Sequence, residues 1–151
     1  MQNKAMQEAA QPLRGRMFNR DSARPKAKRI LVLKTGLAGI QHHVETHKEW
    51  QALKNLQPGT ELMLYREPDN AYDMWAIAVY LTEKDKLGYI TRFKNETIAR
   101  LMDAGKKFIG IVDDIATDEE ARRILEEEEM RSRRAPTENM SVPVSVYLVE
   151  E

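Results

Sequence analysis

The chain has 151 residues, of which 42% are hydrophobic and 32% charged, a composition that fits one domain with a single core and solvated tails. The absence of cysteine excludes disulfides, thiolate metal sites and cysteine nucleophiles. No apolar run approaches the roughly 20 residues of a membrane-spanning helix, and the N-terminus lacks the apolar centre of a secretory signal. We therefore expect a cytoplasmic protein with no membrane partner.

The formal net charge is zero, but the charges are distributed unevenly. Residues 1–29 carry eight Lys/Arg against two acids, whereas residues 118–129 carry seven acids against two arginines. Residues 1–27 also lack apolar periodicity, which predicts a flexible basic N-terminal arm that keeps the domain in solution. A dedicated nucleic-acid-binding arm is the alternative.

In chain order, the β-rich run over 29–40 predicts a first strand, broken by two glycines. After the Pro58-Gly59 turn come predicted strands over 61–67, 76–83 and 87–92, with the turn Pro68-Asp69-Asn70 between the first two.

A helical period follows. Asn95 is the expected N-cap of a short helix that Gly105 ends, residues 108–116 form a strand, and residues 118–134 form an acidic helix capped by Thr117 or Asp118. The last strand alternates over 142–151. Five to six short strands with two inserted helices predict a mostly β (α+β) domain, a small barrel or a sandwich.

The stretch "REPDNAYDMWAIAV" (66–79) places a dense polar and aromatic set before a buried strand. Single-stranded nucleic acid needs aromatic faces that stack on bases beside cations that follow phosphates. Candidate faces are Tyr72, Tyr89, His42, His43 and Trp75, and candidate cations are Arg66, Arg92 and Lys94. The alternative is that Tyr72 and Trp75 pack in the barrel while Asp69, Asn70 and Asp73 only close a turn. Alternation predicts that one of Met74 and Trp75 points inward.

The segments "AGIQHH", "QPGTELMLYREPDNAYDMWAIAV" and "LGYITR" resemble the HIRAN domain over Ile30–Val112. That family occurs in helicase-like DNA-repair ATPases and as small bacterial proteins. The resemblance implies an OB/SH3-like β-barrel, here spanning 28–151 with the acidic helix 118–134 inserted. In the best-understood members the barrel captures single-stranded DNA, particularly a free 3′ end.

The resemblance also implies roles for particular residues. Gln41, His42 and His43 occupy the place of an Arg followed by two aromatics, so the positive charge is lost there. Tyr72 and Asp73, preceded by Asn70, match the pair that stacks on the terminal base and meets the terminal sugar hydroxyl. Tyr89 and Arg92 fall near the phosphates. With Arg66, the predicted nucleic-acid-binding residues are Gln41, His42, His43, Arg66, Asn70, Tyr72, Asp73, Tyr89 and Arg92.

The sequence also contains candidate residues for metal binding and for catalysis. His42, His43 and His47 are a weak candidate metal site, because adjacent residues on a strand face opposite ways and cannot easily share one ion. Glu67 with Asp73, or Asp113 with Asp114, are the acid–base pairs that catalysis would use. No phosphate-binding P-loop and no nucleophile with a plausible base are present, so we expect neither an enzyme nor a cofactor.

The sequence therefore predicts a module that binds single-stranded DNA or DNA 3′ ends and is linked to DNA repair or replication-fork processing. A helicase or a nuclease is the candidate protein partner, and association with the nucleoid is compatible with this function. The alternative is a protein-interaction adaptor that uses the same barrel, with the acidic helix and the basic arm as contacts.

Overall fold

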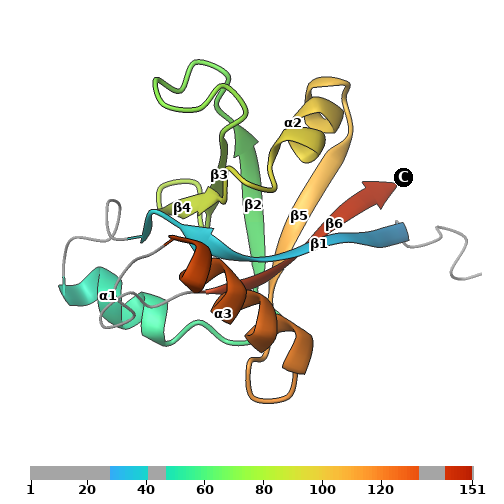
Figure 1. The fold of residues 1–151 in the computed structure, drawn as a ribbon. Coiled ribbons are helices and arrows are strands. Elements are labelled where there is room, and N and C mark those ends of the chain that lie inside the picture. Colours follow the sequence, from blue (N-terminus) through green and yellow to red (C-terminus); the bar gives the residue numbers. More distant parts are fainter. Residues whose placement is uncertain (1–27, 41–46, 133–141, 151) are drawn as a thin grey trace, which may run out of the picture.

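The structure, a computed structural model, describes residues 28–40, 47–132 and 142–150 (Figure 1). Six antiparallel strands close into a barrel in the order β1-β4-β3-β2-β5-β6. The strands are β1 (Lys28–Ala38), β2 (Glu61–Arg66), β3 (Ile77–Tyr80), β4 (Lys86–Ile90), β5 (Lys107–Val112) and β6 (Pro143–Glu150). The predicted mostly β barrel is confirmed.

Three helices connect the strands: α1 (His47–Lys54), α2 (Glu96–Asp103) and α3 (Glu119–Ser132). The sequence predicted α2 and α3, and both are present. It did not predict α1, whose Leu53 is buried in the barrel core. Within the described ranges, no helix is long and apolar enough to cross a membrane.

Alternating side chains build the core. On β6, Val144 and Val146 are completely buried, and on β3 the same holds for Ile77 and Val79. Each such side chain contributes roughly 1.5–3 kcal/mol when removed from water. The period of two therefore selected the apolar inward face of β6, whereas β3 is buried on both faces, since Ala78 between Ile77 and Val79 is also 0% exposed.

β1 and β4 approach each other closely at the end of β1. Their register pairs Leu37 with Ile90 and Ala38 with Tyr89. A Cβ on Gly88 would lie 2.5 Å from the carbonyl oxygen of Ala38, so only glycine allows this approach. The pairing brings Tyr89 beside Ala38, the last residue of β1.

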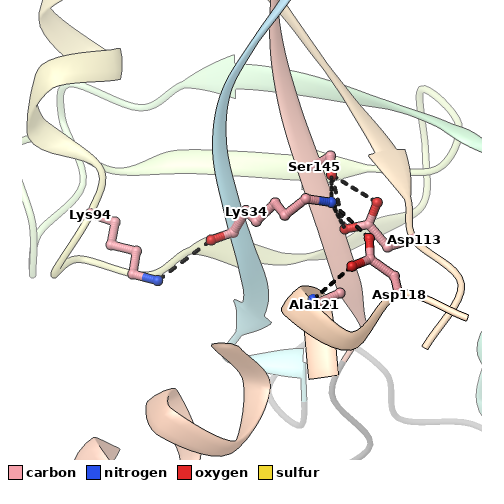
Figure 2. Close-up of polar contacts among 6 residues, drawn as sticks. All are labelled: Lys34, Lys94, Asp113, Asp118, Ala121 and Ser145. Carbon is pink, nitrogen blue, oxygen red and sulfur yellow. Dashed lines mark hydrogen bonds and ion pairs between the residues drawn. The ribbon is translucent and has the colours of Figure 1, made fainter. Parts of the chain in front are cut away.

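A polar cluster attaches the start of α3 to β1 and β6 (Figure 2). Lys34 Nζ donates to Asp118 Oδ2 at 2.8 Å and to Ser145 Oγ at 3.0 Å. Ser145 Oγ in turn donates to Asp113 Oδ1 at 2.7 Å. Asp118 also caps the helix, because its Oδ1 accepts the N–H of Ala121 at 3.0 Å.

The ionisation of this cluster agrees with its geometry. Burial acts to lower the pKa of Lys34, but the hydrogen bond to Asp118 and the charges of Asp118 and Asp113 outweigh it and raise that pKa. The hydrogen bond from Lys34 lowers the pKa of Asp118, with the cap bond in support. The acidic helix is therefore held on the barrel by paired charges.

Candidate nucleic-acid interface

The segment between β2 and β3, residues 67–76, is a hydrogen-bonded loop. Asn70 Oδ1 accepts the backbone N–H groups of Tyr72 at 2.9 Å and of Asp73 at 3.1 Å. The N–H of Glu67 donates to the carbonyl of Ala76 at 3.0 Å and closes the base of the loop. Asn70 thus serves the turn through its side chain, as the turn interpretation predicted.

Tyr72 projects from this loop into solvent and is 95% exposed. Its neighbour Met74 is 63% exposed, whereas Trp75 packs against the core. The Trp75 ring also receives the guanidinium carbon of Arg100 at 4.5 Å from its centroid. The alternation predicted for Met74 and Trp75 is confirmed, and the alternative in which Tyr72 packs in the barrel is wrong.

Arg66, the last residue of β2, supports the loop through hydrogen bonds to its backbone. Its side chain is 11% exposed. Nη1 donates to the carbonyl of Ala76 at 2.7 Å and Nη2 to that of Met74 at 3.0 Å. Nε donates to Asp103 Oδ1 at 2.8 Å and so ties the loop to α2. These bonds occupy most donors of the guanidinium, which gives Arg66 a positioning role.

Glu67, Lys86 and Tyr89 form a compact cluster at the base of the loop. Glu67 Oε2 accepts from Lys86 Nζ at 2.8 Å, and Glu67 Oε1 accepts from the Tyr89 hydroxyl at 2.8 Å and from Asn70 Nδ2 at 3.0 Å. Lys86 Nζ also lies 4.9 Å from the centroid of the Tyr89 ring. The cluster fixes the ring of Tyr89 relative to Asn70.

These contacts shift three pKa values. Burial acts to raise the pKa of Glu67, but the donors Lys86, Asn70 and Tyr89 together hold it below its usual range. Burial acts to lower the pKa of Lys86, and its bond to Glu67 raises it instead. Burial raises the pKa of Tyr89, with Glu67 adding to the effect. Glu67 and Lys86 are accordingly charged, and Tyr89 neutral, near pH 7.

Asp73 is anchored on both oxygens. Oδ1 accepts the N–H of Trp75 at 2.9 Å, and Oδ2 accepts Nδ2 of Asn95 at 2.8 Å. Asn95 is 1% exposed and occupies the N-cap position of α2, but its side chain makes no capping bond. An ionised carboxylate has about four lone-pair positions, so Asp73 retains acceptor capacity toward a hydroxyl.

Beyond β4, Arg92 and Phe93 lie in the turn before α2. Both are exposed, and the Arg92 guanidinium carbon is 5.5 Å from the centroid of Phe93. Lys94 is paired with Glu128 of α3 at 2.6 Å. Of the three predicted cations Arg66, Arg92 and Lys94, only Arg92 has no ion pair within the described part of the chain.

Several predicted residues lie outside the described residues: the arm 1–27, Gln41, His42 and His43. The side chain of His47 is not described either, so the candidate histidine metal site is untested. Among the described residues, no group of three or more His, Asp or Glu side chains is arranged to hold a metal ion.

The candidate acid–base pairs have structural partners. Glu67 contacts Lys86 and Asp73 contacts Asn95, as described above. Asp113 accepts from Ser145, while Asp114 Oδ1 accepts the N–H of Ala116 at 3.0 Å. Each of these carboxylates thus already serves the fold.

Four residues that shape the interface were not predicted as part of it: Glu67, Lys86, Phe93 and Asn95. Asn95 was expected only as a helix cap, and Glu67 only as a member of a catalytic acid–base pair. Lys86 gave no signal, because a lysine at the start of a strand is ordinary. Phe93 had a signal, since a large aromatic between Arg92 and Lys94 in a turn serves no core.

Comparison with known proteins identifies the fold family. Residues 30–147 match the model of the HIRAN domain. A protein from Lactobacillus plantarum of known structure is 25% identical, with a TM-score of 0.59, over 83% of this chain and 99% of its own. The HIRAN domain of human HLTF is 14% identical, with a TM-score of 0.54, over 83% of this chain and 81% of its own. This similarity shows a shared fold.

No curated protein sequence is significantly similar to the chain. The family model nevertheless covers well over half of it, including all six strands in whole or in part. The chain belongs to the HIRAN domain family.

Proposed function

We propose that this chain is a non-enzymatic module that binds single-stranded DNA and prefers a free 3′ end. It would act in DNA repair or replication-fork processing, beside a helicase or a nuclease. The binding surface consists of the loop 67–76 with the end of β4 and the turn that follows. The single observation that carries the proposal is the outward position of Tyr72.

The side chain of Tyr72 contributes almost nothing to the stability of the fold. A large apolar side chain contributes roughly 1.5–3 kcal/mol when fully buried, but Tyr72 is 95% exposed. Its backbone is nonetheless held by Asn70 at 2.9 Å. A fixed backbone with a free aromatic face suits stacking on a base, since the ordering of the loop is complete before the ligand arrives.

The neighbouring groups complete the chemistry. Asp73 is an acceptor for the sugar hydroxyl of a 3′ end, Tyr89 lies beside the end of β1, and Arg92 is a cation for phosphate. Arg66 and Asn70 position the loop. The proposal also includes Gln41, His42 and His43, which lie outside the described residues and would contribute amide and imidazole groups with less positive charge than an arginine would provide.

The proposal is tested by fluorescence anisotropy of a labelled single-stranded oligonucleotide at low and moderate salt, with a free 3′ hydroxyl in one probe and a 3′ phosphate in its twin. Stacking is worth about 1–3 kcal/mol per base, so Tyr72→Ala should weaken binding about 5- to 150-fold. The 3′ phosphate should weaken binding further, because it removes the hydroxyl that Asp73 accepts.

Tyr65→Ala is the matched control, since Tyr65 is a half-exposed tyrosine on β2 outside the loop. Equal binding of both probes would leave a general single-strand binder without end capture. No binding of either probe at low salt, or equal losses in the two tyrosine variants, would contradict the proposal.

A protein-interaction adaptor is the second candidate, and one observation favours it. Ile30, Leu31 and Val32 are 42–46% exposed on β1, and in the described register this half of β1 pairs only with β6. An apolar strand edge of this kind accepts a strand from a partner. Phosphate contacts release counterions, so a steep salt dependence of binding supports DNA over a protein partner.

A further inference from the structure

Phe93 is an exposed aromatic residue that two arginines flank. It lies in the turn between β4 and α2 and is 56% exposed. The Arg92 guanidinium carbon is 5.5 Å from its ring centroid, and that of Arg131 is 5.6 Å away. Arg131 belongs to the last turn of α3, so two segments far apart in sequence meet at this ring.

A carboxylate one helical turn earlier fixes the end of α3 at this position. Glu128 Oε2 accepts from Lys94 Nζ at 2.6 Å and from Thr35 Oγ1 at 2.8 Å, while its Oε1 accepts the N–H of Gly36 at 2.8 Å. Residues three apart lie on the same helix face. Glu128 therefore holds Arg131 toward the turn that contains Lys94.

The same turn is bonded to the proposed DNA-binding loop. Asn95, two residues after Phe93, donates to Asp73 Oδ2 at 2.8 Å from a buried position. Arg92 and Phe93 thus belong to a segment that is fixed to the loop on one side and to α3 on the other.

We infer that Phe93, Arg92 and Arg131 form a second nucleotide-binding position, which stacks one base of single-stranded nucleic acid and neutralises its flanking phosphates. An exposed phenyl ring offers a base a π-face without hydrogen bonds, so it accepts any base. A guanidinium plane stacks on bases and also pairs with phosphate oxygens. This inference rests on the proposed function and extends its surface from the barrel onto α3.

The negative charge of α3 restricts the path that a bound DNA strand can take. Glu126, Glu127 and Glu129 are exposed, and a row of carboxylates repels a polyanion. Glu128 is neutralised by Lys94, and Arg131 follows at the end of the helix. The C-terminal end of α3, where Arg131 lies, is accordingly the part of the helix that tolerates DNA.

The test compares Phe93→Leu and Arg131→Gln with the wild-type full chain. Phe93→Leu keeps an apolar side chain at an exposed position and removes only the ring. Arg123→Gln is the control for charge, since Arg123 is an exposed arginine on the same helix. The probe is a labelled oligothymidylate, and anisotropy is measured over a series of salt concentrations.

Loss of one stacked base should weaken binding about 5- to 150-fold in Phe93→Leu, and Phe93→Trp should retain it. Arg131→Gln should lower the slope of log affinity against log salt by about 0.7, the value for one phosphate contact on a single strand. Arg123→Gln should leave that slope unchanged. Photocrosslinking with an iodouracil oligonucleotide should label the peptide that contains Phe93.

Two failures are distinguishable. If the wild-type chain binds no oligonucleotide, the proposed function fails and this inference fails with it. If the wild type binds and Tyr72→Ala weakens it, while Phe93→Leu and Arg131→Gln match the wild type, only the second position is overturned. Equal effects of Arg131→Gln and Arg123→Gln would also overturn it, because they would show a general charge effect.

Discussion

Asn95→Asp is the sharpest test of how the proposed DNA-binding loop is held. The substitution replaces the amide that donates to Asp73 Oδ2 at 2.8 Å with a carboxylate of nearly the same size, in a position that is 1% exposed. The helix itself should not suffer. Asn95 makes no side-chain cap bond, and Asp and Asn are about equally good at an N-cap.

The expected cost follows from the two carboxylates. Losing a hydrogen bond to a charged group costs about 1.5–3 kcal/mol, and two charges 2.8 Å apart repel by about 6 kcal/mol at an effective dielectric constant of 20. The total destabilisation cannot greatly exceed about 4 kcal/mol, because one of the two carboxylates can take up a proton instead, and protonating a carboxyl of ordinary pKa at pH 7 costs about 4 kcal/mol. We therefore expect Asn95→Asp to lower the free energy of unfolding by about 2–4 kcal/mol at pH 7.

The pH dependence gives this prediction its specific signature. The folded variant binds a proton that the unfolded chain releases above about pH 4, so its deficit grows with pH and shrinks on acidification by at most about 1.4 kcal/mol per pH unit. Urea unfolding of variant and wild type between pH 4 and 7 measures it. Asn55→Asp, at an exposed position after α1, is the control and should change stability by less than about 0.5 kcal/mol. A deficit equal to that of the control, or one that does not depend on pH, would refute the reasoning.

Three further predictions concern the frame of the interface. Gly88→Ala places a Cβ 2.5 Å from the backbone oxygen of Ala38, so thermal and urea unfolding should show a loss of about 1–3 kcal/mol; wild-type stability would contradict the assigned β1–β4 approach. Arg66→Lys keeps the charge but loses the forked contact with the carbonyls of Ala76 and Met74, so both stability and oligonucleotide affinity should fall; unchanged affinity in a stable variant would mean that the loop needs no support from Arg66. The pKa of Glu67 is lowered in the fold, so ionised Glu67 stabilises the folded state fully above its ordinary pKa of 4.5, and this stabilisation is lost as the pH falls through the lowered pKa. Glu67→Gln should therefore reduce the decrease in the free energy of unfolding that acidification causes, as measured by urea unfolding. An unchanged decrease would exclude Glu67 as its cause.

Part of the interface was accessible from local pattern. A loop rich in Pro, Asp and Asn before an apolar strand predicts a turn, and Tyr72 and Asp73 were singled out within it. The roles of Arg66 and Asn95 were not accessible. Arg66 contacts Asp103, which lies 37 residues away, and Asn95 contacts Asp73 over 22 residues. Arg66, which was predicted to contact phosphate, thus supports the loop, and Asn95, which was predicted to cap a helix, holds the side chain of Asp73.

The sequence by itself determined the strands along the chain, two of the three helices and the polar loop before β3, because alternation, turn residues and helix period act within a few residues of each other. Local pattern left a barrel and a sandwich open, and the barrel followed from the family resemblance. Only the tertiary structure decided which polar groups remain accessible. Closure of the barrel brings α3 against β1 and the turn before α2, where Glu128 meets Lys94 and Arg131 meets Phe93. Such pairings depend on how strands and helices pack rather than on spacing, since a side chain is held or left free by neighbours from other elements.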